Sequence, residues 1–407
     1  MKLLHATTVP STLNFLRTQP THLAAHGIEV VLLSSPGEEL ERIAEEEGAQ
    51  ALAVPMHRGF SVGADLATLR QLVRILKEVR PDIVHAHTPK AGLLVTLAGR
   101  LAGVPLCIYQ IHGLRFITAS GIQRQILKLT ERVATTAAHR VLCVSPSVLA
   151  LAEEEHVIRR GKGAVIGTGT INGVDLADFD RERFREESVA IRAELRIAHD
   201  APVIGFVGRL AADKGVAALA AAWVRVRREM PGAHLLLVGT PEDNDPVDPA
   251  VMVTLEQDPR VHLMGFRADV RPYYAAMSVL TLPSAREGFP QTLLEGSAMG
   301  VPTVGSDVPG VSDAVRDGVT GLLFPVHDHE ALADSLLTLL HDPARRAALG
   351  AAGRRWAVAD FDRRIVRERF LRYYLRTAAE RRIAAPVLSG AAAAADSVSP
   401  LPLLRTS

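Results

Sequence analysis

Short apolar runs alternate with longer amphipathic stretches along most of this 407-residue chain, and they do so in two separate series. The first series places apolar runs at residues 3–6, 29–33, 51–55, 83–86, 106–111 and 141–144. The second places them at 203–207, 234–238, 261–263, 279–282 and 303–305. Apolar runs of this length separated by helical patterns are typical of buried parallel strands joined by helices. We therefore predict an α/β fold with two Rossmann-like, doubly wound domains.

The length of the chain also favours two domains, because 407 residues exceed what one hydrophobic core normally supports. Residues 178–200 are highly charged and lack a strand pattern, so we place the boundary there, with domains at 1–185 and 186–360. Helical patterns follow residue 328, and the last of them, at 361–384, is rich in arginine. The tail at 385–407 is rich in Ala, Ser and Pro without periodicity, and we predict that it is disordered.

Charge and cysteine content exclude several classes of protein. The net charge is only +1, which gives no general attraction to nucleic acid. Cys107 and Cys143 are the only cysteines, and both lie in apolar runs, which fits a reducing compartment and argues against a cysteine metal site. No apolar run approaches the ~20 residues that cross a bilayer, and the first residues do not resemble a signal peptide. We predict a cytoplasmic location.

Two carboxylates provide the clearest indication of function. Glu287 and Glu295 stand with seven residues between them, where a loop is predicted to enter a helix. An ionised carboxylate accepts hydrogen bonds only, and it can take two from the neighbouring hydroxyls of a sugar or ribose. The first turn of the helix, at residues 290–293, would add unpaired amides and a positive dipole end that suit phosphate. This arrangement is typical of a nucleotide-sugar site.

Two cations are expected at the same kind of position. Arg209 and Lys214 follow the predicted strand 203–207, where an open α/β sheet presents its ligand-binding loops. Taken alone, they could be solvated charges at the end of a strand. Together with the two glutamates, they predict a site for a diphosphate leaving group, since Arg offers a planar fork and Lys a mobile charge.

Several motifs resemble those of glycosyltransferase family 4, which contains retaining enzymes of GT-B fold. The second half carries G-R-L-A-A-D-K-G, S-A-R-E-G-F-P-Q-T-L-L-E and P-G-V-S-D-A-V-R-D-G-V-T-G-L-L-F. The first half carries D-I-V-H-A-H-T-P-K-A-G, Y-Q-I-H-G-L-R-F and G-T-G-T-I-N-G-V-D-L, which resemble the branch that builds capsular, O-antigen and lipid-linked oligosaccharides. The resemblance covers nearly the whole chain.

The resemblance implies a GT-B enzyme that transfers a sugar from a nucleotide-sugar, with UDP as the expected nucleotide, to a glycan or polyprenyl-diphosphate-linked acceptor. The first domain would lie on the acceptor side, the second would bind the donor, ligand would occupy the cleft, and the helix 361–384 would return to the first domain. Arg209 and Lys214 would hold the diphosphate, Glu295 the ribose and Glu287 the transferred sugar. The remaining donor-binding residues would be Gly288, Phe289, Pro290 and Leu293.

The resemblance also assigns His112, which follows the strand C-I-Y-Q-I, to contact with the donor sugar. His112, Glu287, Arg209 and Lys214 form the predicted catalytic set, and we do not expect His112 to act as a general base. Many family members carry a glycine-rich loop after the first strand, whereas this chain has T-T-V-P-S-T-L-N-F-L. Ser11 and Thr12 are therefore predicted on the acceptor side, together with His87 and Lys90.

No catalytic metal or cofactor is expected. His85 and His87 share one face of a strand, but no third ligand has suitable spacing, so we interpret them as packing and cleft-lining residues. Asp243, Asp245 and Asp248 resemble a metal-binding motif but lie in a polar loop that we place away from the phosphate site. The G-T-G-T-I-N-G run lacks the spacing of a dinucleotide fingerprint.

Other functions remain open from the sequence. Two glutamates could form the acid and base of a glycosidase, but that chemistry gives no role to Arg209 and Lys214. A GT-B nucleotide-sugar epimerase would act without an acceptor, and a non-catalytic nucleotide-sugar-binding protein would not turn over. Either would keep the same donor site.

Membrane contact is a further hypothesis. Arg70, Arg74 and Lys77 fall on one face of a predicted helix, opposite an apolar face, which an ordinary amphipathic surface helix also explains. Basic residues beside an anionic membrane contribute about 1 kcal/mol each. Residues 123–132 and the C-terminal arginines extend the same hypothesis, which would place the enzyme at the inner face of the cell membrane.

Overall fold

The computed structural model describes residues 1–57, 59 and 61–386, so the predicted disordered tail lies outside the described residues from position 387 onward. The chain forms two compact units. One comprises Met1–Asn172 together with the chain from Arg364, and the other comprises Gly173–Arg363. The division therefore falls between residues 172 and 173, earlier than the boundary we placed at 185 and 186. Residues 173–185 belong to the second unit.

The first unit is built on a seven-stranded sheet in the order β3-β2-β1-β4-β5-β6-β7, and every neighbouring pair is parallel. Its strands are β1 (Lys2–Ala6), β2 (Glu29–Ser34), β3 (Gln50–Ala53), β4 (Ile83–Ala86), β5 (Leu106–Ile111), β6 (Arg140–Cys143) and β7 (Gly163–Val165). The helices are α1 (Gln19–Ala25), α2 (Glu38–Glu47), α3 (Val62–Val79), α4 (Pro89–Ala102), α5 (Gly121–Ala137) and α6 (Pro146–Glu154). Short 3₁₀ turns are η1 (Pro10–Leu16) and η2 (Arg115–Ile117).

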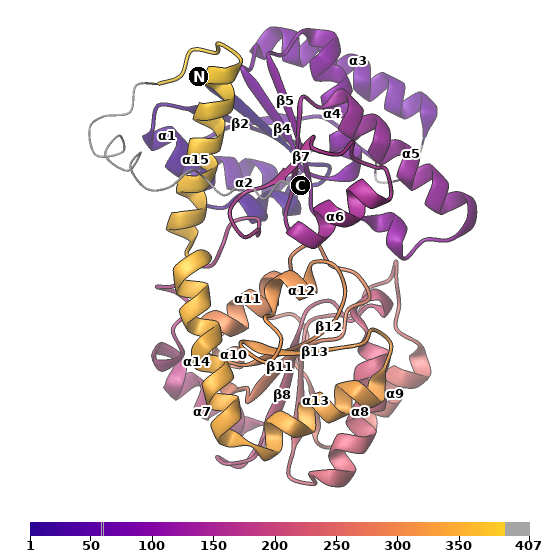
Figure 1. The fold of residues 1–407 in the computed structure, drawn as a ribbon, viewed down its shortest axis with the longest axis vertical. Coiled ribbons are helices and arrows are strands. Elements are labelled where there is room, and N and C mark those ends of the chain that lie inside the picture. Colours follow the sequence, from indigo (N-terminus) through magenta and orange to yellow (C-terminus); the bar gives the residue numbers. More distant parts are fainter. Residues whose placement is uncertain (58, 60, 387–407) are drawn as a thin grey trace. The chain divides into compact units, whose positions relative to one another are not determined.

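Each face of this sheet has its own hydrophobic core. Leu3 and Leu4 belong to different clusters because successive residues of a strand point to opposite faces. Helices α3, α4 and α5 cover one face (Figure 1). On the other face, the cluster includes Phe370 and Tyr374 of the last helix, α15 (Arg363–Glu380). The last helix thus packs on the first unit, as its apolar positions at helical spacing allow.

The second unit contains a six-stranded parallel sheet in the order β10-β9-β8-β11-β12-β13. The strands are β8 (Val203–Val207), β9 (His234–Val238), β10 (Val261–Leu263), β11 (Val279–Leu282), β12 (Thr303–Ser306) and β13 (Gly321–Phe324). The helices are α7 (Arg185–Glu194), α8 (Val216–Glu229), α9 (Pro249–Gln257), α10 (Arg271–Ala276), α11 (Gln291–Ala298), α12 (Val311–Ala314), α13 (His329–His341) and α14 (Pro343–Asp360). The turns η3 (Arg181–Phe184) and η4 (Ala212–Lys214) complete it.

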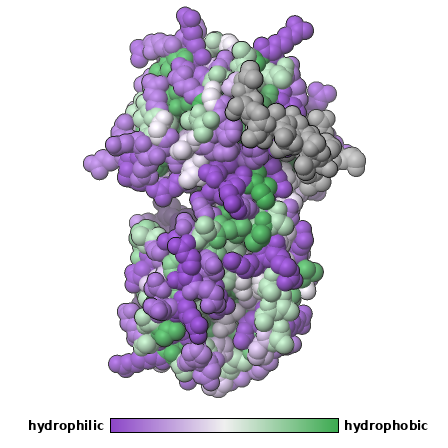
Figure 2. Space-filling view, turned by 90° about the vertical axis from the view of Figure 1, so that its left-hand side faces the viewer, coloured by the Kyte–Doolittle hydropathy of each residue, from purple (hydrophilic) through white to green (hydrophobic). Residues whose placement is uncertain are grey.

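The predicted α/β fold with two Rossmann-like sheets is confirmed, and two details differ. The edge strands β7 and β13 were not predicted; each is short and begins with a glycine. The charged segment 178–200 forms η3 and α7 rather than a featureless crossing. On the face shown in Figure 2, hydrophilic residues cover most of the surface of both units. Among the described residues, no helix has the length and apolar character needed to cross a bilayer.

Candidate functional site

Two loops of the second unit meet at the carboxyl ends of neighbouring strands β8 and β11. Lys214, at the end of the β8 loop, forms an ion pair with Glu287 of the β11 loop at 2.5 Å. The same Glu287 oxygen accepts a hydrogen bond from the Ser284 hydroxyl at 2.7 Å. A second pair joins the same loops, Asp213 with Arg286 at 2.7 Å. The structure thus brings together two of the predicted site residues and adds two charged residues that the sequence did not single out.

Close backbone contact holds these loops together. Gly215 has φ +72°, and a Cβ added there would lie 1.9 Å from the carbonyl oxygen of Pro283. Gly310, in the loop after β12, has φ +86°, and its Cβ would lie 2.4 Å from the carbonyl oxygen of Gly288. A side chain at either position would force the loops apart. Gly215 and Gly310 both belong to motifs quoted for the family resemblance, so close approach explains two of those glycines.

The first turn of α11 offers backbone amides beside the Lys214–Glu287 pair. Pro290 is the N-cap residue and has no side-chain cap, so the amides of residues 291–293 have no partner within the helix. Phe289 and Leu293 are buried and anchor this turn in the core, with Phe289 packed against Phe361. The Gln291 side chain donates to the carbonyl oxygen of Gly173 at 2.9 Å. The turn is therefore fixed in place, with its amide donors available to an anion.

Glu295 has a partner that the sequence did not reveal. The Tyr274 hydroxyl donates to its carboxylate at 2.9 Å. Burial raises the pKa of the Glu295 carboxyl to about 7, an effect opposed by hydrogen bonds from Tyr274 and Gln291 and by the charge of Arg363. A carboxyl group with this pKa exists near neutrality in both protonation states. Hydrogen-bond donors such as ribose hydroxyls would favour the ionised form.

The Arg209 side chain is more exposed than that of Lys214. It is 53% exposed and pairs with Glu242 of the loop after β9 at 2.5 Å. The same loop packs against the β8 loop, since the Asp213 amide donates to the Asp245 carboxylate at 2.8 Å. We had placed Asp243, Asp245 and Asp248 away from the phosphate site, and this was wrong. The loop adjoins the site, but Asp245 holds the Asp213 amide and Asp248 caps α9.

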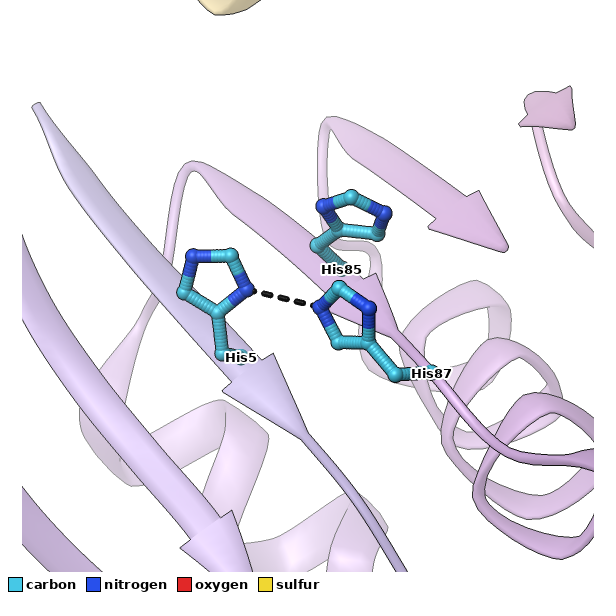
Figure 3. A group of neighbouring side chains, drawn as sticks. All are labelled: His5, His85 and His87. Carbon is cyan, nitrogen blue, oxygen red and sulfur yellow. Dashed lines mark hydrogen bonds between the residues drawn. The ribbon is translucent and has the colours of Figure 1, made fainter. Parts of the chain in front are cut away.

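In the first unit, four histidines gather at the carboxyl ends of β1, β4 and β5. His5 Nδ1 lies 2.8 Å from His87 Nε2, and His87 Nδ1 lies 3.1 Å from His112 Nε2. Figure 3 shows His5 on one strand facing His85 and His87 on the next. His85 Nδ1 is bonded to the Tyr374 hydroxyl of α15 at 2.7 Å. Burial lowers the pKa of His5 to about 3 and that of His112 to about 4, so the imidazoles are neutral.

A third imidazole does lie beside His85 and His87, contrary to our expectation from spacing. His5 is opposite His85 in the parallel register of β1 and β4. The contact geometry nevertheless fits hydrogen bonding better than metal binding. Two ligands of a tetrahedral zinc ion lie about 3.3 Å apart, given Zn–N distances of ~2.0–2.1 Å, whereas His5 and His87 are 2.8 Å apart. Within the described chain, Nε2 of His5 also lacks the acceptor that a metal-bound histidine normally has on its second ring nitrogen.

The predicted acceptor-side residues fall in different surroundings. A cavity of about 220 Å³ is lined by Thr12 and Lys90, together with Thr8, Thr88, Arg115 and five further residues. The Lys90 ammonium donates to Asp65 at 2.6 Å and to the carbonyl oxygen of Gly59 at 2.9 Å. Ser11 is exposed at the start of η1, and His87 is buried in the histidine group. Only Thr12 and Lys90 of the four therefore line this cavity.

Two units that each contain a parallel sheet are typical of the GT-B fold, and comparison with known proteins identifies the class of protein. Residues 16–169 match the family model described as "Glycosyl transferase 4-like domain", and residues 201–342 match "Glycosyl transferases group 1". Together the two matches span most of the chain. The protein belongs to this glycosyltransferase family, the one that its motifs resemble.

Two individual relatives and one solved structure are similar to the chain over most of its length. The chain is 29% identical to the capsular polysaccharide biosynthesis glycosyltransferase CapM of Staphylococcus aureus, over 90% of this chain and 95% of CapM. It is 27% identical to an Escherichia coli UDP-Gal:alpha-D-GlcNAc-diphosphoundecaprenol alpha-1,3-galactosyltransferase, over 73% and 76% of the two chains. Among solved structures, Anabaena HepE in complex with UDP superimposes with a TM-score of 0.77 at 20% identity, over 92% and 100% of the chains. The last likeness supports the GT-B fold.

Proposed function

We propose that this glycosyltransferase moves a sugar from a UDP-sugar to a hydroxyl of a glycan or polyprenyl-diphosphate-linked acceptor, with retention of configuration. The observation that carries the proposal is the meeting of Lys214 and Glu287 beside the open amides of α11. The named substrate of the E. coli relative and the UDP-glucose complex of HepE support the choice of donor and acceptor class.

The residues of the second unit would bind the donor. Lys214, Arg209 and the first amides of α11 would neutralise the diphosphate as its bond to the sugar breaks. Glu287 would then accept from sugar hydroxyls, and Glu295 from the ribose. In the ligand-free protein Lys214 and Glu287 neutralise each other, so neither charge is buried alone. Gly288, Phe289, Pro290 and Leu293 would shape this wall.

The residues of the first unit would bind the acceptor. Thr12 and Lys90 line the 220 Å³ cavity, and Arg115 adds a cation to its wall. Hydroxyls and cations suit a sugar or a diphosphate. We assign His112 to contact with the substrate beside the reacting bond, and much of the catalysis to positioning and charge stabilisation. No step in this scheme uses a metal ion.

Calorimetric titration with UDP, GDP and ADP in EDTA tests the donor site. We expect metal-independent binding of UDP in preference to the other two nucleotides. Incubation of UDP-sugars with and without a diphosphate-lipid acceptor then separates transfer from epimerisation, and the anomeric configuration of the product reports retention. Binding that requires a divalent ion, or conversion of the sugar without acceptor, would contradict the proposal.

We further propose peripheral contact with an anionic membrane through the outer face of α5. Ile122, Ile126, Leu129 and Val133 recur at helical spacing and are 80%, 41%, 61% and 37% exposed. Arg124, Lys128 and Arg132 accompany this stripe, with Arg124 and Lys128 paired to Glu155. The same helix supplies Leu127 and Thr130 to the cavity wall, so a lipid surface on α5 would bring a lipid-linked diphosphate to that cavity.

Sedimentation with vesicles of anionic phospholipid tests this contact. We expect the Ile126→Asp, Leu129→Asp variant to bind at least about tenfold more weakly, since each loses apolar burial and adds a repelled charge. Val224→Asp is the control, because Val224 is an apolar residue of α8 in the second unit that is 63% exposed, close to the 61% of Leu129. Equal vesicle binding by wild type and the α5 variant would contradict the assignment. The Arg70, Arg74 and Lys77 face of α3 would then be the next surface to test.

A further inference from the structure

The three linked histidines of the first unit form a chain in which the protons must be ordered. His87 has both ring nitrogens in hydrogen bonds, one with His5 and the other with His112. A neutral imidazole carries one proton, so His87 donates to one neighbour and accepts from the other. Figure 3 shows the first of these contacts, between His5 of β1 and His87, which follows β4. The state of His112 is therefore coupled to that of His5, two strands away.

Only two arrangements satisfy both contacts when all three rings are neutral. In the first, His112 Nε2–H donates to His87, which donates to His5, and this leaves an N–H on the outer nitrogen of His5. In the second, His5 Nδ1–H donates to His87, which donates to His112 Nε2, and this leaves an N–H on His112 Nδ1. Each arrangement leaves one N–H without a partner among the described residues, at opposite ends of the chain.

The surroundings of the two ends favour the second arrangement. His5 is 0% exposed, and its Nε2 has no partner among the described residues. His112 Nδ1 is also buried and has no partner among the described residues, but His112 as a whole is partly exposed, follows β5 and lies next to the half-exposed ring of Phe15. A buried N–H without an acceptor is rarer and costs more than a bare acceptor nitrogen. The unpaired N–H therefore belongs at His112, which lies nearer the surface than His5, so that its Nδ1 can gain an acceptor when substrate binds.

We propose that His5 and His87 act as positioning residues that fix His112 as a hydrogen-bond donor, with its proton on Nδ1. His112 then offers this N–H to a substrate oxygen, such as a sugar hydroxyl or a phosphate oxygen. A ring held in this form has no free basic nitrogen, since Nε2 already accepts from His87. His112 therefore orients the substrate and does not remove a proton from it.

Two isosteric substitutions at His87 test the proposal in the full-length protein. The amide nitrogen of His87→Asn takes the place of Nδ1–H and still donates to His112. The carboxylate of His87→Asp can only accept, so it requires a proton on His112 Nε2. NMR of protein labelled with ¹⁵N-histidine reports which ring nitrogen is protonated, and the His112 signals are those lost in His112→Gln. We expect Nε2 of His112 to be bare in wild type and His87→Asn and protonated in His87→Asp.

Kinetics then test the functional half, which rests on the proposed transfer reaction. Loss of one hydrogen bond to substrate corresponds to about a tenfold fall in kcat/KM, and we expect this fall in His87→Asp relative to His87→Asn. Unchanged signals from the histidines outside this chain of three show that both variants are folded. A protonated Nε2 in wild type, or a bare one in His87→Asp, would overturn the tautomer assignment. The expected tautomer change with equal kcat/KM would overturn the role of the donor, and a wild type without transferase activity would remove the proposed function alone.

Discussion

The two sheets of this protein carry different groups at the carboxyl ends of their strands: neutral histidines in the first and ion pairs in the second. At the carboxyl ends of the first sheet, His5, His85 and His87 are buried, neutral and bonded to one another or to a tyrosine hydroxyl. At the corresponding ends of the second sheet, the loops carry ion pairs, Lys214 with Glu287 and Asp213 with Arg286. One fold thus provides an uncharged network in one unit and a charged one in the other. The same kind of strand edge suits orientation in the first case and charge neutralisation in the second.

The two units also differ in the surroundings of a buried glutamate that each of them contains. Each unit contains a tyrosine hydroxyl that donates to a glutamate, Tyr109 to Glu131 at 2.8 Å and Tyr274 to Glu295 at 2.9 Å. Burial raises the pKa of both glutamates to about 7. Glu131 stands on the buried face of α5, whereas Glu295 stands on α11, one helix turn from the amides of the candidate donor site. A raised pKa alone therefore does not distinguish a structural carboxyl group from one that binds ligand.

The largest expected effect comes from removing the cations of the second unit. We expect Arg209→Ala with Lys214→Ala to weaken UDP binding about a hundredfold or more, because each hydrogen bond to a charged group contributes roughly 1.5–3 kcal/mol. Calorimetry measures the loss. The matched control is Arg225→Ala with Arg227→Ala, which removes two cations of the same unit. Those arginines pair with Glu229, Glu330, Asp334 and Asp258 instead. Similar losses in both double variants would show that general charge, rather than this site, attracts the nucleotide.

Removing the buried carboxyl group of the first unit should affect stability and its pH dependence. The folded-state pKa of Glu131 is raised, so folding takes up a proton between the ordinary pKa of a glutamate and about 7. Wild-type stability therefore falls as pH rises through this window. We expect the free energy of unfolding of Glu131→Gln, relative to that of wild type, to rise by on the order of 2 kcal/mol from pH 5 to pH 8. Urea unfolding at both pH values measures this, and a gain that does not change with pH would rule out the assigned protonation.

The smallest expected effect is a difference in UDP affinity between substitutions at Glu295 and at Glu131. Glu295→Gln should weaken UDP binding about tenfold, because a neutral amide accepts hydrogen bonds less strongly than a carboxylate. Glu131→Gln should leave UDP affinity unchanged. Calorimetry at pH 8, where most of each carboxyl group is ionised, gives the clearest contrast. If both substitutions weaken UDP binding equally, the distinction between a core carboxyl and a ligand-binding carboxyl fails.

The sequence by itself determined the fold class and much of the candidate site. Apolar runs at strand length are local, and the position of a loop after a strand places its residues at one edge of a parallel sheet. Lys214, Glu287 and the α11 turn could therefore be assigned from order along the chain. The motif glycines Gly215 and Gly310 belonged to the same local signal, since both have a left-handed backbone, which favours glycine.

Tertiary structure alone decided which side chains are partners. His5 stands opposite His85 because β1 pairs with β4 in parallel, and nothing in the spacing of residues 5, 85 and 87 encodes that register. Tyr274 reaches Glu295 and Tyr374 reaches His85 across elements that are distant in sequence. Hydrogen bonds and burial depend on distances of a few ångströms between such elements. The resulting pKa values and the order of protons in the histidine chain are therefore properties of the packed protein, and local sequence pattern does not contain them.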